Sequence, residues 1–276
     1  MFLDKHTIVE QLTPLYGERE AGLIVHNLYL DLFDGRQQLT AEDIRILESS
    51  VKRLLQYEPL QYVTGKAFFR DFVLSVAPGV LIPRPETEEL VDIAIRVAKN
   101  KKCHHVLDIG TGSGCIALAL KKEIPHLKVT AIDKSAEALT IAKGNAQKLG
   151  LDIEWLSCDF LDEKSRSALT PSDLIVSNPP YIGREESHTL APNVLSYEPE
   201  LALFAEGDPL VFYKAIARFG FSAQIPVVCE INEKWGSETR TCFLDAGYSN
   251  VLIHQDLQGK DRFVIADFGL PITIDS

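Results

Sequence analysis

The fold is decided by a glycine-rich turn that reads DIGTGSG at residues 108–114. Residues 106–109 predict a buried strand that leads into this turn, and residues 116–122 predict a helix directly after it. Glycines let the backbone turn tightly and approach a ligand closely. A dinucleotide-binding turn reads Gly-x-Gly-x-x-Gly and would need a glycine at Cys115, whereas this turn reads Gly-x-Gly-x-Gly. The stretch therefore predicts a ligand site at the end of the first strand of an α/β sheet.

Strands and helices alternate after this turn. Further strands are predicted at residues 129–132, 153–156, 174–177 and 225–231, followed by two more at 251–253 and 263–266. A helix at 136–149, which Gly150 closes, is one of the helices between them. Strands that are separated by helices predict a parallel, doubly wound, Rossmann-like sheet. Few residues separate the last two strands, so they predict a hairpin that adds one antiparallel strand.

The first 65 residues predict a small helical domain. Its two apolar stripes comprise Leu23, Val25, Leu28, Leu30, Leu32 and Phe33 in one helix and Ile44, Leu47, Val51, Leu54 and Leu55 in the next. The second helix starts at Thr40, and Asp43 gives it a weak capping-box pattern. We expect the second stripe, Ile44 to Leu55, to form the core of a helical bundle, although it could instead face a partner.

The connection between two domains is predicted at residues 66–84. Apolar residues on both sides of residues 70–71 predict a short β-hairpin. The following stretch, APGVLIPRPETE at 77–88, is rich in proline and marks a domain boundary. It is not a flexible linker, because its apolar residues 80–82 must be buried. We therefore expect a helical substrate-recognition domain at 1–65, a hairpin and linker at 66–84, and a larger domain at 85–276.

Composition and charge narrow the class of ligand. The chain has 276 residues and a formal net charge of −11 at pH 7, whereas nucleic-acid binders usually carry a basic surface. We therefore expect a small-molecule or protein substrate and no direct nucleic-acid partner. Five cysteines without Cys-x-x-Cys or metal spacing predict reduced thiols in a cytoplasmic protein, and no metal. The N-terminus is charged too early for a signal peptide and no run approaches membrane-spanning length, so no membrane partner is expected.

The ligand expected beside the turn is cationic and contains a nucleoside. Asp133 ends the second strand about 20 residues past the turn, where an acid can accept hydrogen bonds from ribose hydroxyls. No basic residue follows inside the turn to hold a phosphate, and Asp108 adds negative charge. S-adenosylmethionine (SAM), which carries a sulfonium cation, fits this balance. Asp159 and Phe160 follow the third strand, where Asp159 could accept from the adenine amine and Phe160 could stack on the ring or be a core aromatic.

A second motif, Asn178-Pro179-Pro180-Tyr181, ends the fourth strand. The prolines fix their own φ and donate no N–H, and the first keeps Asn178 out of the helical region. The Asn178 side-chain oxygen and the Pro179 carbonyl can each accept one N–H of a planar NH2 group, with Tyr181 packed on its plane. Alone, such a motif could be only a rigid turn. Because the carboxyl ends of parallel strands share one crevice, the motif predicts a clamp for a methyl acceptor beside the glycine turn.

Together these motifs resemble the release factor glutamine methyltransferases, the HemK/PrmC family. The resemblance covers almost the whole chain and is most specific at residues 81–88 (LIPRPETE), and it includes 197–199 (YEP) and 257–262 (LQGKDR). Asn-Pro-Pro-Tyr alone is shared with adenine-N6 DNA methyltransferases and some RNA enzymes. The resemblance implies a class I SAM-dependent methyltransferase fold. It also implies methyl transfer from SAM to the side-chain nitrogen of the glutamine in the Gly-Gly-Gln loop of class I peptide-chain release factors, with S-adenosylhomocysteine as the product.

The resemblance also implies roles for individual residues. Cofactor contacts are implied for Gly110, Thr111, Gly112, Ser113, Gly114, Asp133, Phe160 and Asn178, in addition to the Asp159 contact suggested above. The glutamine would be held by Asn178, Pro179, Pro180 and Tyr181, of which Asn178, Pro179 and Tyr181 are the expected catalytic residues. Pro209 departs from the family, which usually has glycine there, and should stiffen its loop. Arg84 is expected either to tether the hairpin through a carboxylate or to line the substrate channel.

Three other functions remain compatible with the sequence. A ribosomal-protein glutamine methyltransferase would use the same clamp. An adenine-N6 nucleic-acid methyltransferase would hold the adenine amine in it, but would need a base-flipping pocket and a basic recognition region. A SAM-binding scaffold with an inactive site is the third, and the intact Asn178–Tyr181 motif argues against it.

Overall fold

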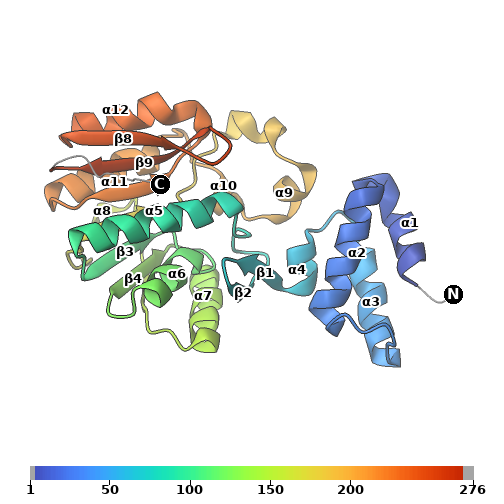
Figure 1. The fold of residues 1–276 in the computed structure, drawn as a ribbon. Helices are drawn as coiled ribbons and strands as arrows, with labels where there is room; N and C mark the ends of the chain where they lie inside the picture. The colour runs from blue at the N-terminus through green and yellow to red at the C-terminus, as the bar shows by residue number, and fades with distance from the viewer. Residues whose placement is uncertain (1–3, 270–276) are drawn as a thin grey trace.

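A seven-stranded sheet forms the centre of the larger part of the protein (Figure 1). The computed structural model describes residues 4–269. The strand order is β5-β4-β3-β6-β7-β9-β8. The strands are β3 (His105–Ile109), β4 (Lys128–Asp133), β5 (Glu154–Ser157), β6 (Leu174–Ser177), β7 (Val227–Glu230), β8 (Asn250–Gln255) and β9 (Asp261–Asp267). Strands β3 to β7 pair in parallel and β9 is antiparallel to both β7 and β8, which confirms the predicted mixed sheet.

Helices cover both faces of this sheet (Figure 1). The helices of this part are α5 (Pro85–Lys101), α6 (Cys115–Glu123), α7 (Ala136–Leu149), α8 (Glu163–Arg166), α9 (Pro192–Tyr197), α10 (Glu200–Leu203), α11 (Val211–Ser222) and α12 (Gly236–Ala246). Side chains of α5, α6 and α7 share one core cluster, and those of α11 and α12 share the other. Successive residues of a strand point to opposite faces, so Val106 joins the first cluster and Leu107 the second. Two separate cores therefore hold the strand ends in place.

Helix α5 begins inside the proline-rich stretch. Its first residue is Pro85. Proline suits the first position of a helix, because its fixed φ is already helical and its missing N–H has no partner there. Glu86 and Glu88 then lie in the first turn, where the helix dipole favours negative charge.

Four helices at the N-terminal end pack around a core of their own, next to the larger part (Figure 1). They are α1 (Lys5–Tyr16), α2 (Glu18–Phe33), α3 (Ala41–Leu54) and α4 (Leu60–Thr64). The capping box at Thr40 and Asp43 is present. The predicted apolar faces were partly wrong, because Leu23, Leu30 and Leu55 are 55%, 47% and 41% exposed. In α2 the buried residues are Ala21, Ile24, Val25, Leu28, Tyr29 and Phe33. They follow the 3.6-residue period, and Leu23 and Leu30 fall on the opposite side of the helix.

A short hairpin, β1 (Lys66–Phe69) and β2 (Phe72–Ser75), lies between the helical part and the sheet (Figure 1). Its turn contains Arg70, as the sequence predicts. After the hairpin the proline-rich stretch buries Val80 and Ile82. The Tyr62 hydroxyl of α4 donates to the Val80 carbonyl over 2.6 Å, which fixes the stretch against the helical part. The division of the chain at residues 65 and 84 stays a prediction.

Candidate active site

A pocket of about 250 Å3 lies at the carboxyl ends of β3, β4, β5 and β6, and we call it the strand-end pocket. It brings together most of the residues that the sequence predicted to bind ligands. The predicted residues that line it are Gly110, Gly112, Asp133, Asp159, Phe160, Asn178, Pro179 and Pro180. Segments 79–81 and 199–202 complete its wall. The strand order reverses beside β3, whose neighbours are β4 and β6, and such a switch point is where open α/β sheets bind ligands.

Four predicted residues lie outside the lining of this pocket. Thr111 and Ser113 are buried, at 3% and 2% exposure. Gly114 packs against Trp155 of β5, because an added Cβ would come within 3.1 Å of that side chain. The Tyr181 hydroxyl points away toward Glu230, to which it donates over 3.2 Å. These four residues therefore do not form the surface of the pocket.

The glycine turn is held by hydrogen bonds to the next strand. Gly110, Gly112 and Gly114 have φ of 72°, 54° and 86°, a region that residues with a side chain rarely adopt. The amides of Gly110 and Thr111 both donate to the Ile132 carbonyl over 3.0 Å. The Gly112 amide donates to the Asp133 carboxylate over 2.9 Å. The turn and the ribose acid predicted from sequence are therefore one rigid unit.

Two carboxyl groups whose pKa values are raised by burial lie at this end of the sheet. Asp133 accepts from the amides of Gly112 and Ser135, and burial raises its pKa. Asp108 is completely buried, and burial raises its pKa to about 7. One of its oxygens accepts from the Thr111 hydroxyl over 2.6 Å, and the other has no hydrogen-bond partner. A buried carboxylate without a full set of partners is stabilised by a nearby cation, so the site is suited to a cationic ligand.

The wall after β5 holds an ion pair that the sequence analysis missed. Lys134 contacts Asp159 over 2.7 Å, which lowers the pKa of the Asp159 carboxyl. The Leu161 amide donates to the other oxygen of Asp159. Lys134 directly follows Asp133, the acid predicted to bind ribose, and that position is the available signal for it. Phe160 lines the pocket and also packs edge-on against Phe219, so its two expected roles are compatible.

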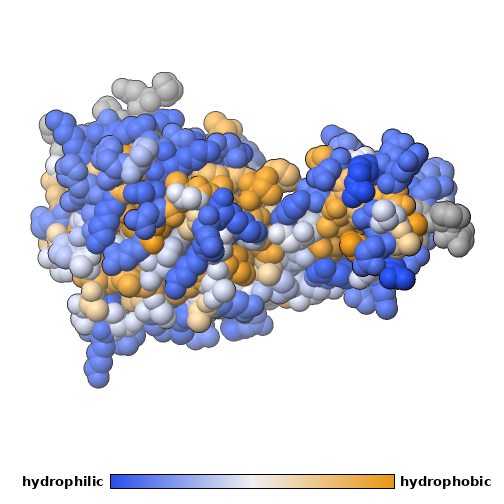
Figure 2. Space-filling view, turned by 90° about the horizontal axis from the view of Figure 1, so that it is seen from below, coloured by the Kyte–Doolittle hydropathy of each residue, from blue (hydrophilic) through white to orange (hydrophobic). Residues whose placement is uncertain are grey.

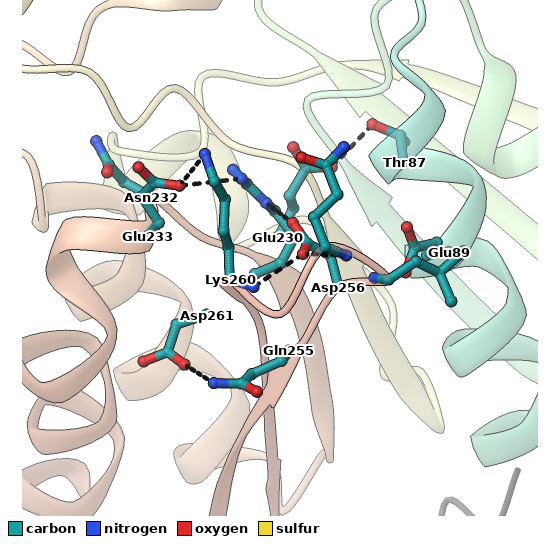
Figure 3. A network of polar contacts seen from close by, with 12 residues as sticks. Thr87, Glu89, Glu230, Asn232, Glu233, Gln255, Asp256, Lys260 and Asp261 are labelled. Atoms are coloured by element: carbon teal, nitrogen blue, oxygen red, sulfur yellow. Dashed lines mark hydrogen bonds and ion pairs between the residues drawn. The ribbon is translucent and has the colours of Figure 1, made fainter.

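Asn178 is joined by hydrogen bonds to two residues that the sequence analysis did not select. Its side-chain nitrogen donates to the Thr87 hydroxyl over 3.0 Å. That hydroxyl in turn donates to Glu230 over 2.8 Å (Figure 3). Glu230 is 1% exposed, and burial raises its pKa to about 7. Burial also raises the pKa of Tyr181, and its hydroxyl donates to the second oxygen of Glu230. Glu230 ends β7 at the same edge of the sheet. The rule that ligand sites lie at the carboxyl ends of parallel strands, which predicts Asn178, therefore also points to Glu230.

One side of the strand-end pocket is formed by residues 182–205, which we call the roof segment. Ile182 and Phe204 form a parallel bridge at its two ends. Glu198 is buried in it and accepts from the Ile82 amide over 3.2 Å. Arg84 contacts the same carboxylate over 2.5 Å. Arg84 therefore acts as a tether through a carboxylate, the first of its two expected roles, and the proline-rich stretch is fixed to the roof segment.

Three further properties concern residues 4–269, the part of the chain that the structure describes. No cluster of three or more His, Cys, Asp or Glu side chains in this range is placed to hold a metal ion. Cys103, Cys115, Cys158 and Cys229 are buried free thiols and Cys242 is half-buried. In the same range, no helix is both long enough and apolar enough to cross a membrane.

Comparison with known proteins gives matches along most of the chain. The family profile of the methyltransferase small domain matches residues 91–211. The chain is 42% identical to the release factor glutamine methyltransferase of Bacteroides thetaiotaomicron, over 86% of each chain. It is 45% identical to that of Streptococcus pneumoniae, over 86% of this chain and 85% of the relative. It is 35% identical to that of Flavobacterium psychrophilum, over 94% of this chain and 96% of the relative.

Solved structures share the fold at lower identity. The catalytic domain of human METTL16 in complex with an RNA hairpin superposes with a TM-score of 0.59 at 16% identity, covering 88% of each chain. The N-terminal domain of human METTL16 in complex with S-adenosylhomocysteine superposes with a TM-score of 0.52 at 18% identity, covering 86% of this chain and 87% of that one. These similarities confirm the class I methyltransferase fold that the sequence predicts.

Proposed function

The chain belongs to the family of release factor glutamine methyltransferases, and we propose how its site transfers the methyl group of SAM to the glutamine of a class I peptide-chain release factor. The observation that carries this proposal is the lining of the strand-end pocket. The glycine turn, Asp133 and Asn178–Pro180 reach it from three different strand ends. The residues predicted to bind SAM and those predicted to hold the amide therefore line one cavity.

The residues at the ends of β3, β4 and β5 fit SAM. Asp133 retains acceptor capacity for ribose hydroxyls beside the turn, and Phe160 presents an apolar ring to the adenine. The buried Asp108 carboxyl lies beneath the turn, and a nearby cation would favour its ionised form. SAM, when bound, supplies an electrophilic methyl group on a cationic sulfur, and the rest of the molecule is released as S-adenosylhomocysteine. The Asp159 carboxylate is engaged by Lys134, so a contact to the adenine amine would have to share this carboxylate.

The residues after β6 fit the side-chain amide of glutamine. An amide nitrogen is a weak nucleophile because its lone pair is delocalised. The Asn178 side-chain oxygen and the Pro179 carbonyl would each accept one of its N–H groups, and both oxygens favour the positive charge that develops on nitrogen. Holding the nitrogen in line with the methyl group can lower the barrier by several kcal/mol, up to about 7–11 in ideal cases. We propose that no base acts before transfer, because the nitrogen becomes acidic only once methylated.

The partner proposed for the helical part is the body of the release factor. Helices α1 to α4 carry their own core beside the catalytic part, so they can contact a protein whose glutamine loop enters the strand-end pocket (Figure 1). Apolar surface gathers where the two parts meet (Figure 2). Phe68 of the hairpin and Leu201 of the roof segment are 61% and 52% exposed. Such apolar surface is typical of protein docking sites.

A methylation assay with radiolabelled SAM tests the function. Purified class I release factor, ribosomal proteins and DNA are offered side by side, together with a release factor whose Gly-Gly-Gln glutamine is replaced by alanine. We expect label on the intact release factor and none on its glutamine variant. Label on ribosomal protein or DNA alone, or on nothing, would contradict the proposal.

A further inference from the structure

Asn178 is the first member of a buried chain of hydrogen bonds that ends on Glu230. The chain runs from the Asn178 side-chain nitrogen to the Thr87 hydroxyl and from that hydroxyl to Glu230. Thr87 is 2% exposed and Glu230 is 1% exposed, so water does not replace either contact. The contacts join residues that are 91 and 143 positions apart in sequence, from the end of β6, from α5 and from β7. Figure 3 shows the Thr87 hydroxyl directed at Glu230.

The chemistry of the three groups gives this chain one direction. An ionised carboxylate can only accept hydrogen bonds, and a hydroxyl has a single proton to donate. The Thr87 hydroxyl therefore donates to Glu230 and can only accept from Asn178. The Asn178 group that faces Thr87 must then be its NH2, which leaves its carbonyl oxygen for the strand-end pocket. Reversing the amide would leave Thr87 without a donor and place an NH2 opposite the NH2 of the substrate.

We propose that Thr87 and Glu230 are positioning residues that hold the Asn178 amide with its oxygen toward the methyl acceptor. The inference rests on the proposed function, since it concerns the clamp that Asn178 provides there. Tyr181 supports the arrangement, because its hydroxyl occupies the second oxygen of Glu230 and keeps that carboxylate in place. A release factor glutamine that enters the pocket thus meets an acceptor whose orientation is already fixed.

The charge of Glu230 sets the direction, so the arrangement depends on pH. A protonated Glu230 could donate to Thr87, whose hydroxyl would then donate to the Asn178 oxygen and reverse the amide. The titratable or charged groups that face Glu230 are Glu86 of α5, Cys115 of α6, Tyr181 after β6, Tyr213 of α11 and Arg262 of β9. Arg262 favours the ionised form, and burial, the larger effect, raises the pKa of Glu230 to about 7. Activity should therefore fall as the pH falls through this value.

Single-turnover methylation of release factor by Thr87→Val tests the proposal, because valine keeps the shape of threonine and removes its hydroxyl. We expect the rate at saturating SAM to fall about tenfold or more, the scale of one lost buried hydrogen-bond partner, while the Kd for SAM changes less than about twofold. Thr87→Ser should restore the rate to within about threefold, because it keeps the hydroxyl. Thr140→Val is the matched control, since its hydroxyl is exposed and bonds only to its own helix.

The pH profile provides a second readout that a purely structural role would not move. The wild-type rate should fall between about pH 8 and pH 6, and Glu230→Gln, which cannot ionise, should remove this step. A Thr87→Val rate within about twofold of wild type, or a step that persists in Glu230→Gln, would overturn the proposal. If Asn178→Ala loses activity and Thr87→Val does not, only this inference fails. If Asn178→Ala stays active, the proposed clamp itself fails.

Discussion

Replacing Glu198 by alanine should loosen the roof segment over the strand-end pocket. The Glu198 side chain is 1% exposed and accepts from both the Ile82 amide and Arg84. Pro199 and Leu201, immediately after it, line the pocket. Alanine at this position would leave a buried amide without an acceptor and a guanidinium without its carboxylate.

The magnitude follows from these two losses. A buried N–H left unpaired costs about 1–3 kcal/mol. The Arg84 side chain is 33% exposed, so water compensates in part and the lost ion pair adds about 1 kcal/mol. The free energy of unfolding should therefore fall by about 2–4 kcal/mol, and SAM affinity should fall about three- to tenfold because the pocket wall is less fixed.

Urea unfolding and calorimetric SAM titration of Glu198→Ala measure these two effects. Glu200→Gln is the matched control in the same segment, because Glu200 and its partner Arg184 are 68% and 57% exposed. We expect the control to change stability by less than about 0.5 kcal/mol. Glu198→Gln keeps an acceptor for the Ile82 amide, so its loss in the free energy of unfolding should lie between those of Glu198→Ala and Glu200→Gln. A loss below about 0.5 kcal/mol in Glu198→Ala, with unchanged SAM affinity, would refute the reasoning.

Two further predictions concern the acids of the cofactor wall. Asp133→Ala should weaken SAM binding about tenfold or more, because the variant loses the ribose acceptor and the anchor of Gly112, and unchanged affinity by calorimetry would remove Asp133 from the site. Asp108→Asn should stabilise the ligand-free protein increasingly as pH rises. Burial raises the pKa of Asp108 in the folded state from 3.8 to about 7, so its contribution to stability is lost as pH rises through that range. The difference in the free energy of unfolding should reach up to about 4 kcal/mol at pH 8 and shrink toward pH 4, and a difference independent of pH would contradict this.

The position of the site could be predicted from sequence because one rule covers all its parts. Parallel strands place their carboxyl ends at one edge, so a turn after β3, Asp133 after β4 and Asn178 after β6 had to share a crevice. No distances were needed for this conclusion.

The partners of these residues could not be predicted in the same way. Thr87 and Glu230 are 143 positions apart, and their contact depends on how α5 packs beside β7. The sequence predicts that Tyr181 packs on the amide plane of the substrate, but it contains no local signal for the hydrogen bond from the Tyr181 hydroxyl to Glu230. The predicted apolar face of α2 is wrong at Leu23, because Leu23 lies on the side of the helix opposite the buried residues.

The most direct test of the clamp is single-turnover methylation of a class I release factor by Asn178→Ala, followed by mass spectrometry of the Gly-Gly-Gln peptide. SAM affinity is measured by calorimetry on the same preparation. Removing a preorganised polar partner should lower the rate about 100-fold or more while SAM affinity stays within a few-fold. A near-normal rate of glutamine methylation by Asn178→Ala would contradict the account.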